Sequence, residues 1–332
     1  MTASHADNPT VDLESIQSYD RSLFLGAVSP AQVWRWAECA RVRQVPLATL
    51  PTRSDERQDA HRASLFPNRY GDCITPAMNA DIPLPIVLVH GLIGSLDEPA
   101  LVAPFHPHPV LAVPLLGYGV NAGIDPAVIT LPAQAEHVAR ALRAQFNAGP
   151  VHLVGHSVGG VVAALLAHQH PELVAALVSV EGNFTLKDAF WSASVGRMSQ
   201  ADADAMLDGF RADPAAWLAR SEVEPTPDHV AVAARWLANQ PASTLCAMGR
   251  SIVETTGVPS YEELLRVVFA RTPVHLVAGE RSRAGWDVPG WAEQQAASSN
   301  VVPATGHMMM LEDPDGFGYV VLRAIGRADT AV

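Results

Sequence analysis

The sequence predicts an α/β fold: a mostly parallel sheet with helices on both faces and a helical segment inserted late in the chain. Three observations predict it. Short aliphatic, β-branched runs end at glycine or at a polar residue, and near-continuous apolar strands are typical of a parallel sheet covered on both faces. Stretches with helical periodicity lie between these runs. The alternation of strand and helix indicates βαβ units, and one long interval interrupts it.

Four runs are expected to form strands of this sheet. They are 85–89 (PIVLV), 151–154 (VHLV), 175–180 (AALVSV) and 274–278 (VHLVA). A fifth run, 110–115 (VLAVPL), contains Pro114. Because proline has no N–H to donate to a neighbouring strand, the fifth strand is expected to end there.

Two stretches between these runs are expected to form helices of the core. From Pro132, a residue favoured in the first helical turn, Val138, Leu142 and Phe146 recur at four-residue spacing. That spacing marks one buried face and predicts a crossover helix. Residues 158–169 are apolar nearly all round, as expected for a helix buried behind a central strand.

Residues 184–269 interrupt the alternation and are predicted to form an inserted helical lid. Large apolar side chains are frequent there, and most are expected to pack within the protein, although as a group they suggest an apolar cleft. They are Trp191, Met198, Met206, Phe210, Trp217, Trp236 and Met248. The predicted domains are therefore an extension (1–80), a core in two parts (81–183 and 270–332) and the lid between the parts.

Composition restricts the classes of partner. Lys and Arg number 22 against 34 Asp and Glu, a net charge of −12 that disfavours nucleic acid and anionic membranes. No apolar stretch approaches the roughly 20 residues of a membrane helix. The first twenty residues are polar and acidic, unlike a secretory signal. We expect a cytoplasmic protein without nucleic acid or membrane partners; the sequence does not predict its oligomeric state.

No metal or other cofactor is expected. The three cysteines are far apart, without the spacing of metal ligands or of a disulfide framework; they are Cys39, Cys73 and Cys246. Two histidine pairs lack a nearby carboxylate or cysteine that would complete a metal site; they are His106 with His108, and His168 with His170.

Residues 155–159 read Gly-His-Ser-Val-Gly, after a predicted strand and before a predicted helix. A tight strand-to-helix turn of this kind exposes the serine hydroxyl, and its small glycines avoid collisions with neighbouring chain segments. The N–H of Val158, at the start of the helix, is placed to bind an oxyanion. Ser157 is therefore the predicted nucleophile.

The second oxyanion donor is expected in the loop that follows the run 85–89. This loop begins His90-Gly91-Leu92, and the backbone N–H of Leu92 is the predicted donor. His90 is expected to fix the loop in place and not to act as the catalytic base.

Three segments resemble the α/β-hydrolases. IVLVHGLIGS, VHLVGHSVGGVVAALLA and VVPATGHMMMLEDPDGF are similar, in matching order, to the oxyanion strand, the nucleophile turn and the terminal histidine loop of that family. The resemblance implies an eight-stranded, mostly parallel sheet, a triad of serine, acid and histidine, and usually no cofactor. It assigns the base to His307.

The acid of the triad is one of two points at which the chain departs from the family pattern; the other is the loop 114–121, which lacks the usual Asp-x-x-Gly-x-Gly turn. The usual aspartate would fall at Ser282, which cannot supply a negative charge. Glu181 instead ends the run 175–180, and haloalkane dehalogenases and certain lipases are similar in placing their acid after this strand. Glu181 is the preferred candidate, and Glu280 and Asp287 remain alternatives.

These residues predict a serine hydrolase that cleaves a carboxylic ester of a small apolar acyl substrate through an acyl-enzyme. Dehalogenases and epoxide hydrolases would need a carboxylate in place of Ser157. Thioester hydrolysis, carbon–carbon bond hydrolysis and acyl transfer on the same triad remain open. A noncatalytic receptor on this scaffold is the less favoured alternative, because fold alone does not determine function.

Overall fold

The computed structural model describes residues 83–147 and 149–326, which contain a parallel six-stranded sheet in the order β2-β1-β3-β4-β5-β6. Every neighbouring pair of strands is parallel, so the predicted fold class is confirmed. The two further strands that the family resemblance implies are not among the described residues. The strands are β1 (Ile86–Val89), β2 (Val110–Ala112), β3 (Val151–His156), β4 (Val174–Val180), β5 (Val274–Gly279) and β6 (Ser298–Val302).

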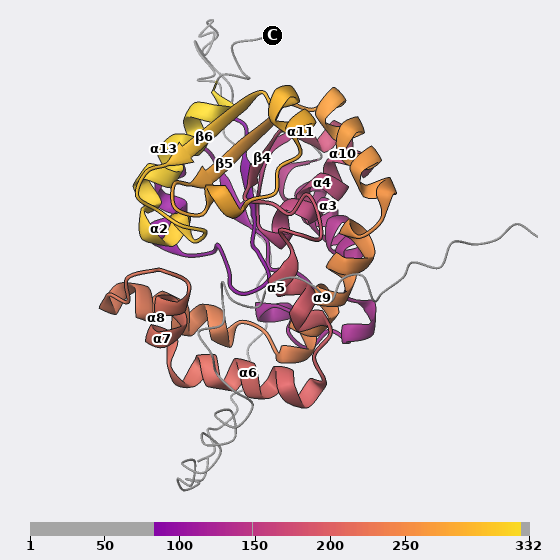
Figure 1. Cartoon of the computed structure of the whole chain (residues 1–332). Helices are drawn as coiled ribbons and strands as arrows, with labels where there is room; N and C mark the ends of the chain where they lie inside the picture. The colour runs from indigo at the N-terminus through magenta and orange to yellow at the C-terminus, as the bar shows by residue number, and fades with distance from the viewer. Residues whose placement is uncertain (1–82, 148, 327–332) are drawn as a thin grey trace, which may run out of the picture. The chain divides into compact units, whose positions relative to one another are not determined.

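Helices cover both faces of the sheet (Figure 1). One layer contains α3 (Leu131–Phe146), α4 (Val158–Gln169), α10 (Pro259–Arg271) and α11 (Gly290–Gln295). The other contains α2 (Pro99–Val102) and α13 (Pro314–Ile325), with α12 (Met309–Glu312) packed against α13. This double cover explains why all residues of β1 and β5 are buried.

The crossover helix α3 begins where the sequence indicates. The Thr130 hydroxyl accepts a hydrogen bond from the Ala133 N–H at 3.2 Å, and Pro132 occupies the first turn. Thr130 therefore acts as the N-cap and satisfies one of the free N–H groups at the helix start. Val138 and Leu142 are fully buried, as their spacing predicts.

The chain between β4 and β5 is helical. It contains α5 (Phe190–Gly196), α6 (Gln200–Ala212), α7 (Pro214–Arg220), α8 (Pro227–Ala238) and α9 (Ala242–Thr256), followed by α10. Figure 1 shows α6, α7 and α8 grouped away from the sheet, whereas α10 packs along α4. Residue 269, where the predicted lid ends, lies within α10 and not at the end of a helix. The extension predicted for residues 1–80 lies outside the described residues.

Most large side chains of this insertion are in the core. Trp217, Trp236 and Met248 are buried. Three others, Met198, Met206 and Phe210, are partly buried and pack against the same core. Trp191 differs, because 37% of its surface is exposed. The expectation that these residues mainly pack within the protein agrees with the structure.

Helices α5 and α9 lie side by side (Figure 1) and approach each other most closely at a pair of glycines. A Cβ atom added to Gly249 would collide with the Ser192 carbonyl oxygen, and one added to Gly196 would collide with the backbone of Gly249. The two helices thus touch backbone to backbone, which leaves no room for a side chain at the crossing.

We predict that Gly249→Ala lowers the free energy of unfolding by about 1–3 kcal/mol, because overpacking forces the two helices apart. Gly209→Ala is the matched control. Nothing lies within 4 Å of a Cβ added at Gly209 on α6, so its helix propensity should raise stability by about 1 kcal/mol. Denaturant unfolding measures both changes. A Gly249→Ala protein as stable as the wild type would contradict the close crossing.

Candidate active site

Ser157 connects β3 to α4 in a strained backbone conformation. Its φ is 53° and its ψ is −125°, a combination that residues with a side chain rarely adopt. The Ser157 N–H donates to the Val180 carbonyl at 3.0 Å, which ties the turn to the end of β4. Such strain persists only where surrounding structure fixes the backbone, and it is frequent at functional sites.

The glycines of the turn allow neighbouring segments to pass very close to it. A Cβ atom at Gly159 would collide with the carbonyl oxygens of Val89 and His90 at the end of β1. One at Gly160 would lie 2.6 Å from the Cα of Gly182, just after β4. The first turn of α4 therefore fits between two strand ends only because these positions lack side chains.

The loop after β1 lies against the serine. A Cβ atom added to Gly91 would be 3.1 Å from the Cβ of Ser157. Leu92, the predicted oxyanion donor, follows Gly91 directly and is buried. The other predicted donor, Val158, is the first residue of α4, and the first N–H groups of a helix have no partner within the helix.

Two side chains fix the peptide groups on either side of Leu92. His90 Nδ1 donates to the Gly91 carbonyl at 2.8 Å, and the Tyr118 hydroxyl donates to the Leu92 carbonyl at 2.8 Å. Because C=O and N–H of a trans peptide point in opposite directions, fixing the Gly91 carbonyl also fixes the Leu92 N–H. Burial lowers the pKa of His90 to about 4. The ring is thus neutral at pH 7, as expected for a structural histidine.

His307 lies in the loop between β6 and α12 and is bonded to Glu181. Its Nδ1 is 2.6 Å from Glu181 Oε2, with 47% of the His307 side chain exposed but only 4% of the Glu181 side chain. A proton on Nδ1 donates to the carboxylate and leaves a lone pair on Nε2. This is the tautomer that a general base requires.

Glu181 is held by groups from β5 and the loop after it. Its Oε1 accepts hydrogen bonds from the Gly279 N–H at 3.0 Å and from the Ser282 hydroxyl at 2.5 Å. Burial raises the pKa of Glu181, but the hydrogen bond and positive charge of His307 and the hydrogen bonds from Ser282 and Gly279 outweigh it. The net result is a pKa below the usual value. Ser282, at the position where the family pattern has an aspartate, thus stabilises the Glu181 carboxylate.

The two alternative acids are engaged elsewhere. Asp287 accepts a hydrogen bond from the Thr185 hydroxyl at 2.8 Å and pairs with the Lys187 ammonium at 3.0 Å. Glu280 accepts a hydrogen bond from the Ala304 N–H at 2.8 Å. Of the three carboxylates that the sequence offers, the structure brings one to the imidazole of the predicted base.

His156, which the sequence analysis did not single out, connects the serine turn to the histidine loop. Its Nε2 donates to the His307 carbonyl at 3.0 Å, and the two ring centroids are 4.6 Å apart. Burial lowers the pKa of His156 well below its usual value, and the positive charge of a protonated His307 lowers it further. His156 therefore remains neutral and adds no positive charge beside the base.

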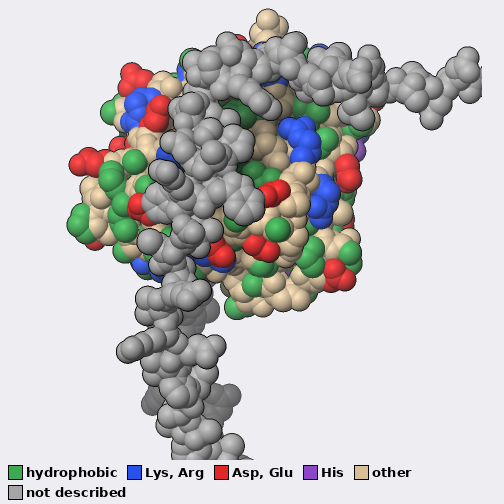
Figure 2. Space-filling view, turned by 60° about the horizontal axis from the view of Figure 1, so that its bottom comes forward, with side chains coloured by type: hydrophobic (Ala, Val, Ile, Leu, Met, Phe, Trp, Pro, Cys, Tyr) green, Lys and Arg blue, Asp and Glu red, His purple; other side chains and the backbone are tan. Residues whose placement is uncertain are grey.

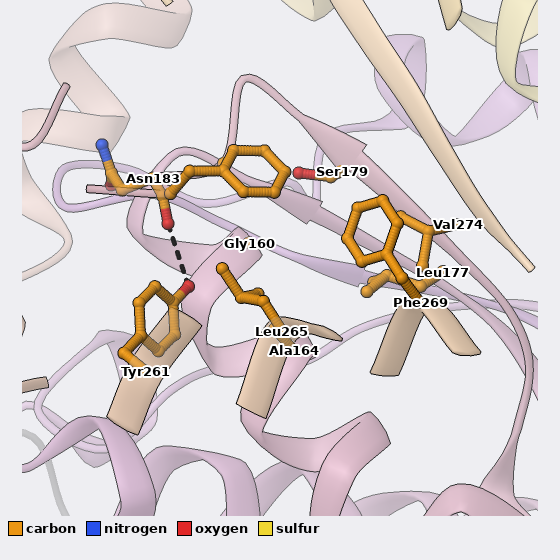
Figure 3. A pocket seen from close by; sticks show the side chains of 11 residues that line it. Gly160, Ala164, Leu177, Ser179, Asn183, Tyr261, Leu265, Phe269 and Val274 are labelled. Carbon is orange, nitrogen blue, oxygen red and sulfur yellow. Dashed lines mark hydrogen bonds between the residues drawn. The ribbon is translucent and has the colours of Figure 1, made fainter. Parts of the chain in front are cut away.

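A small cavity lies between β4, α4 and α10 (Figure 3). Its volume is about 10 Å³, close to the space that one water molecule needs. The Tyr261 hydroxyl reaches across it and donates to the Asn183 carbonyl at 2.9 Å. This cavity is too small for an acyl substrate. The Tyr261 hydrogen bond fixes the backbone two residues after Glu181.

One histidine of each pair has a structural side-chain contact. His108 Nδ1 bonds to the Leu84 carbonyl at 2.8 Å, and His170, which caps the end of α4, lies 2.7 Å from Glu136. Within the described residues, no cluster of three or more His, Cys, Asp or Glu side chains could hold a metal ion. Cys246 is buried, and the other two cysteines lie outside the described residues.

None of the described helices is both long enough and apolar enough to span a bilayer.

Comparison with known proteins identifies relatives of this chain. The profile of the Alpha/beta hydrolase family matches residues 86–317. The chain is 30% identical over 172 residues to pimeloyl-(acyl-carrier protein) methyl ester esterase of Aeromonas hydrophila, covering 49% of this chain and 64% of that protein. It is 39% identical over 67 residues to the probable lysophospholipase BODYGUARD 1 of Arabidopsis thaliana, covering 20% and 14%. The chain thus spans less than two thirds of either relative.

A solved structure shows the same fold. MenH from S. aureus superimposes with a TM-score of 0.58 at 20% sequence identity, covering 76% of this chain and 96% of that one. At this identity the likeness concerns the arrangement of the sheet and helices.

We predict that Glu181→Gln lowers kcat by at least about 10²-fold, because the amide keeps the size but loses the charge that stabilises the imidazolium. Asp287→Asn and Glu280→Gln are the matched controls and should retain most of the wild-type kcat. Steady-state kinetics on a nitrophenyl ester measures all three. A nearly fully active Glu181→Gln beside a crippled control would assign the acid to that control residue.

Ser282→Ala should lower kcat by roughly 10-fold, because it removes a hydrogen bond to a charged group. The pKa of Glu181 should then rise toward its usual value, so the carboxylate is lost earlier as the pH falls. The loss relative to wild type should therefore be larger at about pH 5 than at about pH 8. Ser282→Thr keeps the hydroxyl and should restore the profile. Equal profiles for Ser282→Ala and wild type would remove Ser282 from the site.

Proposed function

The chain belongs to the alpha/beta hydrolase family, and we propose that it is a serine hydrolase in which Ser157 attacks a carboxylic ester with His307 as base and Glu181 as acid. The observation that carries this proposal is the 2.6 Å contact between His307 and Glu181, on the edge of the sheet where Ser157 occupies its strained turn. A serine whose proton such a base accepts is activated for covalent catalysis.

In the first half of the proposed cycle, Ser157 Oγ forms a bond to the acyl carbon while His307 Nε2 takes its proton. The carbonyl oxygen becomes an oxyanion that the N–H groups of Leu92 and Val158 stabilise. The tetrahedral intermediate then breaks its bond to the alcohol oxygen, which leaves with the proton from His307. The product is an ester between Ser157 and the acyl group.

In the second half, water attacks this ester and gives a proton to His307. The same two N–H groups stabilise the second oxyanion, and Ser157 leaves with the proton from the imidazolium. Glu181 stabilises the positive charge of His307 in both halves. Because His156 stays neutral, no like charge opposes the imidazolium at the ring centroid distance of 4.6 Å.

The proposed substrate is a small molecule with an apolar acyl group in ester linkage. The relatives support an ester: one is a methyl ester esterase and another a probable lysophospholipase. Thioester hydrolysis, carbon–carbon bond hydrolysis and acyl transfer would use the same groups. A screen of nitrophenyl esters of graded acyl length against acyl thioesters separates ester hydrolysis from thioester hydrolysis. The inserted helices α5 to α9 are the proposed lid of the acyl site.

Partners other than a small molecule are not proposed. On the face shown in Figure 2, acidic side chains are distributed over the surface and the Lys and Arg side chains form small separate groups. Nucleic acid binding needs a continuous basic surface, and the net charge of −12 opposes it. A cytoplasmic location remains a prediction from the sequence.

Ser157→Ala should abolish turnover, with kcat at least about 10⁴-fold lower, because only the nucleophilic hydroxyl is removed. A fluorophosphonate probe should label the wild type at Ser157 and leave the variant unlabelled, as mass spectrometry of the peptides would show. Circular dichroism checks that the variant is folded. Retention of more than a tenth of the activity would exclude Ser157 as the nucleophile, and slow or absent wild-type labelling would favour a noncatalytic receptor.

A further inference from the structure

The C-terminal end of α8 binds the loop that follows Leu92. The Asn239 side-chain amide donates to the Gly94 carbonyl at 2.7 Å, and the Gln240 side-chain oxygen accepts from the Gly94 N–H at 3.3 Å. Both polar backbone groups of Gly94 are therefore bonded to the insertion, although about 145 residues separate the partners along the chain.

The same loop bends against an aromatic ring of α8. Gly94 has a φ of +119°, which favours glycine, and a Cβ atom added to it would lie 3.1 Å from the indole of Trp236. Trp236 is only 4% exposed. The bend that follows the predicted oxyanion donor is thus shaped by contact with α8, and a larger residue would not fit.

An ion pair closes the far end of this loop. Arg235 donates from Nε to Glu98 Oε1 at 3.0 Å and from a terminal nitrogen to Glu98 Oε2 at 2.6 Å. The Glu98 side chain is only 8% exposed. A two-point arginine contact fixes direction as well as distance, and loss of the arginine would leave a buried carboxylate unpaired.

A second route connects the end of α8 to Leu92. The Asn239 carbonyl accepts from the Gly119 N–H at 2.7 Å, and the preceding residue, Tyr118, donates its hydroxyl to the Leu92 carbonyl. Asn239 therefore supports the position of Leu92 from two sides: through Gly94 by its side chain and through Gly119 by its backbone.

We propose that Asn239 and Arg235 are positioning residues, through which the insertion holds the Leu92 N–H in place for the oxyanion. This inference rests on the proposed function, because it assumes that the Leu92 N–H binds an oxyanion. The end of α8 is then a fixed part of the catalytic site as well as part of a cover over it. Loosening it weakens stabilisation of the transition state and leaves the contact of His307 with Glu181 unchanged.

Asn239→Ala tests the proposal, since it removes the side-chain contact with Gly94 and keeps the backbone contact with Gly119. We expect kcat for a nitrophenyl ester to fall about 10-fold, less than the roughly 10²-fold or greater cost of removing an oxyanion donor. KM should be unchanged. The inhibition constant of a trifluoromethyl ketone, which forms a tetrahedral oxyanion with the serine, should rise by the same factor as kcat falls.

Two further variants make the test independent of stability. Arg235→Lys keeps the charge beside Glu98 but loses the two-point contact, and should shift kcat and the inhibition constant in the same direction by a smaller factor. Gln200→Ala is the control: this exposed amide on α6 bonds only to Asp204 of its own helix, and both constants should stay at wild-type values. Thermal unfolding identifies any variant that fails to fold.

The proposal is overturned if Asn239→Ala and Arg235→Lys retain wild-type kcat and ketone inhibition, or if they change KM alone. The second result would limit α8 to substrate binding. Failure of the proposed function is distinguishable from both, because the wild type itself would then neither hydrolyse the ester nor bind the ketone.

Discussion

The hydrogen bond between His307 and Glu181 is the contact on which the proposed site depends, and the order of the strands makes it possible. In the proposed triad a base and an acid that are far apart in sequence must come together beside a serine, and neighbouring parallel strands can bring such residues to one place. Because β3, β4, β5 and β6 are neighbours in that order, their carboxyl ends share one edge of the sheet. Ser157 follows β3, Glu181 follows β4 and His307 follows β6, so that three of these four strands each lead to one group.

The backbone at this edge is strained where it carries those groups. Ser157 and Glu181 both have positive φ, at 53° and 42°, a conformation that costs about 1–3 kcal/mol for a residue with a side chain. Packing on every side maintains it. The indole N–H of Trp286, for example, donates to the Gly182 carbonyl at 2.8 Å and fixes the peptide between Gly182 and Asn183. Hydrogen bonds of this kind from surrounding residues hold the side chains of a site in a fixed geometry.

The local sequence predicted the elements whose signal is local. Apolar runs gave β1, β3, β4 and β5, and the turn glycines gave Ser157. It did not predict β6, because the segment SSNVV is half exposed at the edge of the sheet and lacks a continuous apolar run. Tyr118 and Asn239 support the loop after β1 across 26 and 145 residues of chain, and no periodicity reveals such contacts. In the sequence, Ser282 is notable only because it stands where the family pattern has an aspartate. Its hydrogen bond to Glu181 joins residues that are far apart in the chain, so no local pattern predicts it.

The most direct test of the central claim is the far-downfield proton NMR spectrum, in which an imidazole N–H bonded to a carboxylate gives a separate signal. The wild type should show this signal for His307 Nδ1–H, and Ser157→Ala should retain it. In Glu181→Gln the signal should disappear or move strongly upfield, because a neutral amide is a weaker acceptor than a carboxylate. An unchanged signal in Glu181→Gln, together with its loss in Asp287→Asn or Glu280→Gln, would contradict the assignment of Glu181 as the acid.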